Sequence, residues 1–225
     1  MYLYELHMHT MEGSKCAHSS IHDMIRRYKE IGFTGAVVTN HFTGGYTTVD
    51  LDLPWDKLVE DFCSCYYEGL KTAKELDFDL LFGVEQGYAR GKEFLAYGFE
   101  PEFLLEHPEL RAADLPTWDK IVRGAGGFMA FAHPFRTKPY IPWPMPMPDM
   151  TDMVDGFEGY NRSNTPLENE EAMNRISPLG LTAIAGSDWH DTNFDDANGV
   201  ALNHRVKTSK ELAQVLKSGD FLLKI

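Results

Sequence analysis

Short apolar runs alternate with longer amphipathic stretches along most of this 225-residue chain. Gly35-Ala-Val-Val-Thr39 and Phe128-Met-Ala-Phe-Ala132 are almost entirely apolar, which is typical of strands buried on both faces of a parallel sheet. Repeated strand and helix units without a linker indicate parallel strands joined by right-handed crossovers. We therefore expect one domain over residues 1–225, with an α/β fold that forms an incomplete or distorted barrel.

The same pattern predicts the individual elements. Strands are expected at residues 2–6, 35–39, 80–84, 94–99, 128–132, 153–160, 181–185 and 221–223, and helices at 20–31, 55–76, 117–125, 166–177 and 209–218. Ser20 and Asp23 form a capping candidate at the start of the first helix, and Gly32 follows its end. Residues 139–148 contain five prolines and Trp143, so we expect an irregular loop with apolar surface for a ring or base.

Five of the expected strands end at histidine, aspartate or glutamate. His7 and His9 are two residues apart, so on a strand both imidazoles share one face. The C-terminal ends of parallel strands meet at one end of such a fold, which brings these side chains together. The residues at the strand ends are His7, His9, His41, Glu85, His133, Asp188 and His190. This set predicts a metal site.

The types of ligand restrict the choice of metal. Imidazoles and carboxylates without a thiolate suit zinc, manganese or iron. More than four ligands imply more than one ion, and a carboxylate such as Glu85 can bridge two ions about 3.5–4 Å apart, as in two-metal hydrolases. One ion would lower the pKa of a bound water molecule, and the other would polarise a phosphoryl or carbonyl oxygen.

The composition disfavours some partners. The chain has 21 lysines and arginines against 34 acidic residues, a formal charge of −13, so we do not expect it to bind a nucleic-acid backbone. Cys16, Cys63 and Cys65 form no disulfide framework and are interpreted as reduced thiols. Without a leader sequence or an apolar run of membrane-spanning length, we expect a cytoplasmic protein that does not bind membranes, with homo-oligomers left open.

The strand-end residues lie in five ordered motifs, which are spread from the first expected strand to the last third of the chain. These motifs are Glu5-Leu-His7-Met-His9-Thr-Met-Glu12-Gly13, Val38-Thr-Asn40-His41, Phe82-Gly-Val-Glu85, Phe131-Ala-His133-Pro134 and Gly186-Ser-Asp188-Trp-His190. With them the chain resembles the PHP family, named for polymerase and histidinol phosphatase. The resemblance implies a distorted (β/α)7 barrel whose di- or trinuclear metal centre, at the C-terminal ends of the strands, hydrolyses phosphoesters.

The resemblance also implies a ligand set for two or three divalent ions. His7, His9, Glu85 and Asp188 match the ligands of one ion, Glu85 and His133 those of a second, and His41 and His190 those of a third. Glu12 stands where the family has an Asp or His that completes the third site. Asn40 replaces a common Asp, which removes a charge beside the site. Tyr97 stands where a second-site histidine is expected, so that ion is one protein ligand short, and His107 is a weak substitute.

Two arginines are candidates for binding the phosphate of a substrate. Arg136 follows His133 on the same loop, and Arg162 follows the strand expected at 153–160. We expect a metal-bound hydroxide to attack a small phosphomonoester, as in histidinol phosphatases, while Arg136 stabilises the phosphoryl charge. Asp188 and His190 are both candidates for protonating the leaving group.

Two other functions remain open on the sequence. Metal-dependent amidohydrolases also begin with His-x-His on the first strand of a barrel, but their last motif normally supplies one aspartate rather than the pair Asp188 and His190. A regulatory module that binds metal without turnover is the second alternative, and Tyr97 in place of a ligand gives it some support.

Overall fold

The computed structural model describes residues 1–141 and 148–225. The strands are β1 Tyr2–Met8, β2 Gly35–Val38, β3 Asp79–Ala89, β4 Lys92–Tyr97, β5 Phe128–Ala132, β6 Gly156–Asn161, β7 Thr182–Gly186, β8 Gly199–Leu202 and β9 Phe221–Lys224. The α-helices are α1 Ile21–Glu30, α2 Trp55–Glu75, α3 Pro101–Glu106, α4 Leu115–Trp118, α5 Pro166–Ile176 and α6 Ser209–Ser218. Short 3-10 helices are η1 Pro108–Ala112, η3 Pro148–Met153 and η4 Ser177–Leu179, and η2 Asp119–Arg123 is a π-helix.

These bounds confirm most of the expected elements, correct two of them, and add the helix α3 and the strand β8, which were not expected. Ser20 caps α1 by accepting a hydrogen bond from the Asp23 amide, as predicted. The strand expected at 153–160 begins only at Gly156, because residues 148–153 form the 3-10 helix η3. Strand β8 was not predicted, and the helix expected at 117–125 is α4 followed by the π-helix η2. Trp143 and most of the proline-rich loop lie outside the described residues.

The strands form one mixed sheet. Within the described residues the sheet has nine strands in the order β7-β6-β5-β4-β3-β2-β1-β8-β9. Strands β1 to β3 run parallel, as do β5 to β7, but β4 is antiparallel to both its neighbours, and β8 and β9 are antiparallel additions at the edge. The expectation of parallel strands throughout was therefore wrong for β4, because Arg90 and Gly91 form a two-residue turn that leaves no room for a crossover helix.

Strands β1 to β7 curl into a nearly closed, distorted barrel, which confirms the expected fold class. At the beginning of β1, Tyr2 to Tyr4 pair with β8. At its end, β1 instead meets the segment that follows β7, where the Asp188 amide donates to the His7 carbonyl (2.8 Å) and the His9 amide to the Trp189 carbonyl (3.2 Å). The barrel is thus closed at the end where His7, His9 and Asp188 lie.

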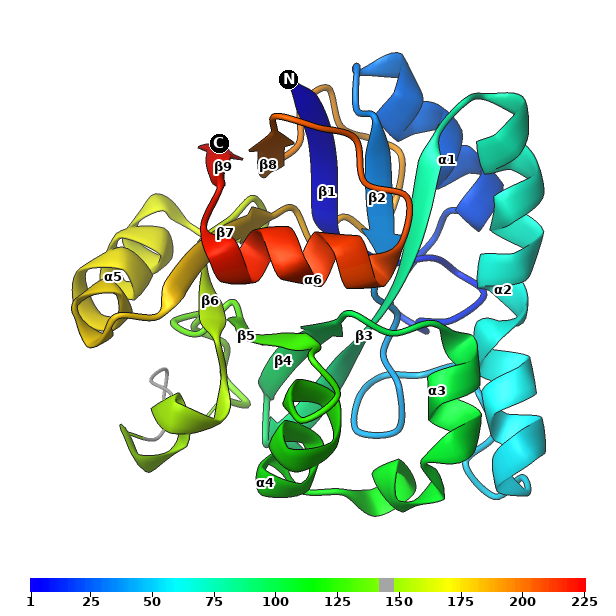
Figure 1. The fold of residues 1–225 in the computed structure, drawn as a ribbon, viewed down its shortest axis with the longest axis horizontal. Coiled ribbons are helices and arrows are strands. Elements are labelled where there is room, and N and C mark those ends of the chain that lie inside the picture. The colour runs from blue at the N-terminus through cyan, green and yellow to red at the C-terminus, as the bar shows by residue number, and fades with distance from the viewer. Residues whose placement is uncertain (142–147) are drawn as a thin grey trace.

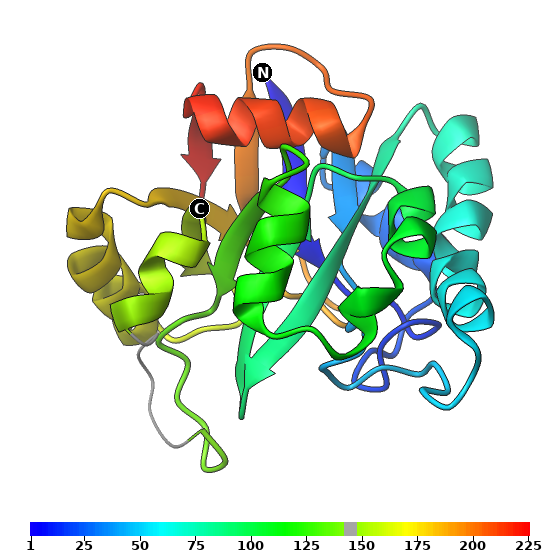
Figure 2. The ribbon, with the colours of Figure 1, turned by 60° about the horizontal axis from the view of Figure 1, so that its bottom comes forward.

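The interior of the barrel is apolar at one end and carries acidic side chains at the other. On β4 the alternate residues Glu93, Leu95 and Tyr97 share a face, and on β3 Leu81 shares one with Glu85. Leu81, Leu95 and Tyr97 belong to an apolar cluster that includes Leu212 and Leu216 of α6. Figure 2 shows α6 lying across the sheet near the start of β1. One end of the interior is therefore filled by apolar side chains, while Glu85 and Glu93 lie at the other.

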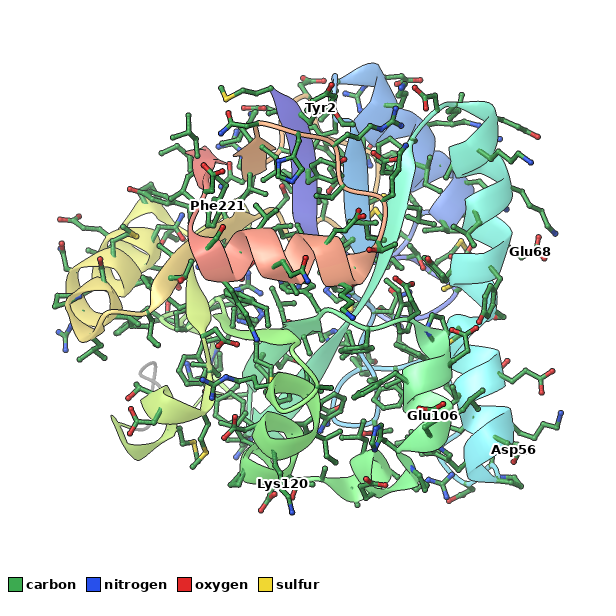
Figure 3. The ribbon with its side chains drawn as sticks, in the orientation of Figure 1. Tyr2, Asp56, Glu68, Glu106, Lys120 and Phe221 are labelled. Atoms are coloured by element: carbon green, nitrogen blue, oxygen red, sulfur yellow. The ribbon has the colours of Figure 1, made fainter. Side chains whose placement is uncertain are left out.

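The remaining helices cover the outside of the sheet. Helices α1 and α2 lie together on one side, and α5 lies on the opposite side (Figure 1). Figure 3 shows Asp56 and Glu68 of α2 pointing away from the sheet. Among the described residues, every helix is too short or too polar to cross a membrane.

Candidate metal centre

Four side chains meet at the closed end of the barrel. His7 comes from β1, His9 follows it, Glu85 lies on β3, and Asp188 follows β7. The Nε2 atoms of His7 and His9 are 3.0 Å apart. Asp188 Oδ1 lies 3.4 Å from His7 Nε2 and 3.2 Å from His9 Nε2. Glu85 contributes Oε1 at 3.3 Å from His7 Nε2 and Oε2 at 3.2 Å from His9 Nε2.

These separations fit the spacing of ligands around one ion. In a tetrahedral site with metal–ligand bonds of about 2.0–2.1 Å, neighbouring ligand atoms lie roughly 3.3 Å apart. The five measured separations among these side chains run from 3.0 to 3.4 Å. All four residues are almost fully buried, so the clustered donors have little access to water that would otherwise solvate them. The residues present therefore fit a divalent metal ion.

Glu85 also faces a second group of possible ligands. Its Oε2 lies 2.9 Å from His41 Nδ1, and its Oε1 lies 3.0 Å from His133 Nε2. Glu93 of β4 reaches the same two histidines, with Oε1 at 3.4 Å from His41 Nδ1 and Oε2 at 3.5 Å from His133 Nε2. The position of Glu85 between both groups is the one that a carboxylate bridging two ions requires.

Glu93 was not among the residues expected at the site. It lies at the start of β4, and because β4 runs antiparallel to β3, its start and not its end faces the other ligands. Tyr97, where a further ligand was expected, lies at the far end of the same strand and donates through its hydroxyl to the Leu6 carbonyl (2.7 Å). Glu93 thus brings a carboxylate to His41 and His133, the group for which the sequence offered no further ligand.

Irregular backbone aims several of these side chains. His133 and Asp188 have φ angles of 30° and 58°, in the left-handed region that residues other than glycine rarely adopt. A register shift in β1 between Glu5 and Met8 re-aims His7, which lies within it. Such strain is concentrated at functional sites, where the surrounding structure holds it in place.

Buried polar groups hold the two histidines of β1 in place. Glu158 of β6 accepts from His7 Nδ1 (2.9 Å) through Oε1 and from the His133 amide (2.7 Å) through Oε2. Ser14 Oγ lies 2.9 Å from His9 Nδ1 and donates to Asn40 Oδ1 (3.0 Å). In each histidine the Nδ1 atom is therefore engaged, so that Nε2 faces the cluster. Neither Glu158 nor Ser14 was predicted as part of the site.

The ionisable groups of the cluster strongly perturb one another. Burial alone would lower the pKa of His7, but the carboxylates around it, Glu158 first, raise it well above its usual value. Burial would raise the pKa of Asp188, but Arg136 and then His7 hold it well below its usual range. A burial-driven rise in the pKa of Glu93 is reinforced by Glu85. The carboxylates thus attract positive charge, which divalent ions would supply.

His190 lies at the edge of the cluster. Its ring stacks on that of His9 with centroids 4.5 Å apart, and its Nδ1 lies 2.8 Å from the Asp188 carbonyl. Burial, followed by the effect of His9, lowers the pKa of His190 to about 4. With Nδ1–H donating to the carbonyl, the neutral ring carries its lone pair on Nε2. Ring nitrogens of His9, His41 and His190 lie within 4.8 Å of one another, so these residues form a third group of possible ligands.

A cavity of about 370 Å³ opens over the cluster. It is lined by Cys16, His41, Tyr46, Glu85, Gly91, Glu93, His133, Arg136, Tyr140, Asp188 and His190. Arg136 reaches in from the loop after His133, and its Nη1 lies 2.6 Å from Asp188 Oδ2. Its Nε and Nη2 donate to Asn164 Oδ1 (2.9 Å) and Asn161 Oδ1 (3.0 Å). The guanidinium is thus fixed at the wall of the cavity.

Three other predicted or considered residues lie elsewhere. The carboxylate of Glu12 accepts from the Ile21 amide (3.2 Å) at the start of α1, so it acts there as a helix cap. Arg162 is exposed and outside the residues that line the cavity. His107 pairs with Glu109 (3.0 Å) on the surface. The expectation that Glu12 and Arg162 belong to the site is therefore corrected.

Comparison with known proteins bears on the fold of this chain. No family profile matches the sequence, and no curated protein is similar to it in sequence. A two-domain protein from Bacteroides vulgatus, with a region predicted to be a PHP-like metal-dependent phosphoesterase, aligns with a TM-score of 0.75 at 16% identity, over 100% of this chain and 64% of that one. The chain has a PHP-like fold.

Two further solved structures share this PHP-like fold. A protein from Bifidobacterium adolescentis named as a metal-dependent phosphoesterase aligns with a TM-score of 0.62 at 15% identity, over 95% of both chains. An amidohydrolase from Chromobacterium violaceum, with bound sulfate and no metal, aligns with a TM-score of 0.62 at 14% identity, over 97% of both chains. The fold alone therefore does not separate phosphoester from amide hydrolysis.

Proposed function

We propose that this chain is a metal-dependent phosphoesterase of the PHP family that hydrolyses a small phosphomonoester, in the manner of a histidinol phosphatase. The observation that carries the proposal is the group formed by His7, His9, Glu85 and Asp188, whose polar atoms have the spacing of ligands around one ion. The PHP-like fold and the names of two neighbours support the same reading.

The described ligands would hold two or three ions of zinc, manganese or iron. His7, His9, Glu85 and Asp188 would hold one, and Glu85, Glu93, His41 and His133 a second. When bound, such ions lower the pKa of a coordinated water molecule and neutralise the charge of phosphoryl oxygens. Without them Glu85, Glu93 and Asp188 would repel a phosphate from the cavity, which explains why hydrolysis should depend on metal.

Arg136 is the side chain best placed to orient the phosphate. Three of its nitrogens contact Asp188, Asn161 and Asn164, which fixes the plane of the guanidinium. These three contacts use three of five N–H groups and leave donors for a phosphoryl oxygen. Because Arg136 also pairs with Asp188, it ties the position of the phosphate to that of a metal ligand.

Asp188 and His190 were both candidates for protonating the leaving group, and their surroundings argue against each of them. Because its pKa is about 4, the His190 ring is uncharged at neutral pH. Its Nδ1–H donates to the Asp188 carbonyl, so its Nε2 offers a lone pair and not a proton. Asp188 is held ionised by Arg136. Both residues are therefore better suited to hold an ion than to act as the acid, and a solvent molecule would protonate the leaving oxygen.

The proposal is tested by phosphate release from sugar phosphates, nucleoside monophosphates and histidinol phosphate, with Mn²⁺ or Zn²⁺ added. We expect release that Asp188→Asn lowers at least about 100-fold, because the substitution removes a ligand and the partner of Arg136. Glu12→Gln is the matched control and should retain activity, since Glu12 lies at the start of α1. Release that is unchanged in Asp188→Asn would contradict the proposed mechanism.

The amidohydrolase neighbour makes amide hydrolysis the second candidate function. Assays of N-acyl and cyclic amide substrates with the same metals distinguish the two. Turnover of amides without release of phosphate would replace the phosphoesterase proposal. Bound metal without turnover of either class would favour the regulatory module.

A further inference from the structure

Asn161 is the last residue of β6 and lies where this strand meets β7. Its neighbour Arg162 was the residue expected at the site, but Arg162 is exposed and Asn161 is fully buried. The backbone of Asn161 pairs with Gly186 of β7. Its amide donates to the side chain of Asn169 on α5 (3.1 Å), which in turn donates to its carbonyl (3.0 Å). The side chain of Asn161 is therefore held in the interior by a fixed backbone.

The side-chain amide of Asn161 lies between the arginine of the cavity and the carboxylate that holds His7. Its Oδ1 accepts from Arg136 Nη2 (3.0 Å), and its Nδ2 donates to Glu158 Oε2 (2.8 Å). The other oxygen of Glu158 accepts from His7 Nδ1 (2.9 Å). A continuous chain of hydrogen bonds thus runs from the guanidinium at the cavity wall to a residue of the proposed metal centre.

Only one orientation of the Asn161 amide satisfies both of its neighbours. A guanidinium can only donate hydrogen bonds, and an ionised carboxylate can only accept them. Arg136 therefore requires the oxygen of Asn161, and Glu158 requires its nitrogen. The same oxygen accepts from the Ser163 amide (3.0 Å), which agrees with this assignment. Because Asn161 and Glu158 are fully buried, a shift of either side chain that breaks their bond leaves polar groups unsatisfied.

A second asparagine, Asn164, holds the same arginine but not the carboxylate. Its Oδ1 accepts from Arg136 Nε (2.9 Å). In the described part of the chain, the side chain of Asn164 makes no hydrogen bond to Glu158. Both asparagines therefore fix the guanidinium, but only Asn161 connects it to the carboxylate that orients His7. The two residues form a matched pair that separates these roles.

We propose that Asn161 is a positioning residue that couples the binding of phosphate at Arg136 to the binding of metal at His7, so that each strengthens the other. The inference rests on the metal centre and the phosphate-binding role of Arg136 proposed above. Phosphate fixes the chain of hydrogen bonds from the guanidinium, and an ion fixes it from His7. Whichever binds second meets a chain that is already ordered, so it binds more tightly. By linkage, phosphate raises the affinity for metal by the same factor as metal raises the affinity for phosphate.

The zinc affinity with and without inorganic phosphate tests this coupling. Wild type, Asn161→Ala and Asn164→Ala compete for Zn²⁺ with a chromophoric chelator, which keeps free Zn²⁺ too low to precipitate with phosphate. We expect saturating phosphate to raise the zinc affinity of the wild type at least about fivefold. Asn164→Ala should keep this enhancement, although it needs more phosphate to reach it. Asn161→Ala should keep clearly less of it, and equal enhancement in the two variants would overturn the proposal.

A double-mutant cycle with Glu158→Gln shows whether Asn161 acts through Glu158. Without phosphate, we expect Asn161→Ala to weaken zinc binding about 3- to 10-fold, less than the loss of Glu158 itself, because Asn161 reaches His7 only through that carboxylate. In the Glu158→Gln background the same substitution should add little. Asn164→Ala should change the zinc affinity little in either background. Additive losses from Asn161→Ala and Glu158→Gln would contradict the proposed path.

The same measurements separate this inference from the proposals on which it rests. Urea denaturation of the metal-free proteins shows whether Asn161→Ala is folded, and Asn161→Ser, which keeps a short polar side chain, replaces it if it is not. A wild type that binds no Zn²⁺ would overturn the metal centre and the coupling together. Zinc binding that phosphate leaves unchanged would overturn the coupling but not the metal centre. Coupling without phosphate release from any substrate would keep the role of Asn161 and overturn only the proposed hydrolysis.

Discussion

Glu85 contacts four histidines, and this explains how a carboxylate can be buried at the centre of the site. Its two oxygens lie 2.9 to 3.3 Å from ring nitrogens of His7, His9, His41 and His133. Burial would raise the pKa of Glu85, but His7 and then His41 hold it well below its usual value. A buried charge persists only when such partners or a metal ion compensate it.

Glu93 and Glu12 give a matched pair of variants at the residue scale. We expect Glu93→Gln to lower the number of tightly bound ions per chain by about one, because it weakens the only carboxylate besides Glu85 that reaches both His41 and His133 in the described structure. Glu12→Gln should leave the metal content unchanged. Elemental analysis after gel filtration measures both, and the reverse order of the two effects would contradict the site described here.

Glu158 affects the metal through His7. We expect Glu158→Gln to weaken zinc binding about 10- to 100-fold, since the carboxylate that accepts from His7 Nδ1 orients the ring and makes it a better donor. Competition with a chromophoric chelator measures the affinity, and Glu170→Gln on the exposed face of α5 is the control. Equal affinities of the two variants would show that Glu158 does not position the ligand.

At the scale of elements, the direction of each strand decides which residues reach the site. The hydrophobic runs of the parallel strands are visible in the sequence, and the structure brings together the residues expected beside them, such as Glu85 on β3 and His133 after β5. Glu93 was missed because the two-residue turn at Gly91 reverses β4, so that a ligand lies at the start of a strand. The placement of Glu12 depends on the path of the turn before α1, which the hydrophobic pattern does not determine.

Helix α5 fixes the loop that carries Arg136. Thr165 and Glu168 form a capping box at its start, and Glu168 Oε1 also accepts from the amide and hydroxyl of Thr137 (both 2.6 Å), the residue after Arg136. We expect Thr165→Ala to lower the free energy of unfolding by about 1 kcal/mol, because a helix amide loses its acceptor. Urea denaturation measures the change. Thr165→Ser, which keeps the hydroxyl, should behave like the wild type, and an equal loss in both variants would exclude the capping role.

In the whole molecule, the apolar core and the acidic side chains occupy opposite ends of the barrel. Its interior is apolar where α6 packs across it and acidic at the opposite end, where the strands close around His7 and Asp188. The fold class and this polarity were predictable from the alternation of apolar runs. The closure was not, because it depends on one long-range contact between the end of β1 and the residues after β7.

Removal of metal should destabilise the whole molecule. An ion present at about 100 times its dissociation constant adds about 2.7 kcal/mol to the free energy of unfolding, which corresponds to roughly 5–10 °C in Tm for a domain of this size. We therefore expect EDTA to lower the Tm by this amount in calorimetry. Asp188→Asn, which has lost a ligand, should show a clearly smaller shift. An unchanged Tm in the wild type would mean that bound metal does not contribute to the free energy of unfolding.

We expect His7, His9, Glu85 and Asp188 to surround one metal ion. Anomalous diffraction at the zinc or manganese absorption edge, from crystals grown with that metal, tests it most directly. We predict a peak about 2.0–2.2 Å from His7 Nε2, His9 Nε2 and Asp188 Oδ1, with Glu85 as the fourth ligand. An anomalous map without a peak among these four side chains, in protein shown to be folded and exposed to the metal, would contradict this metal site.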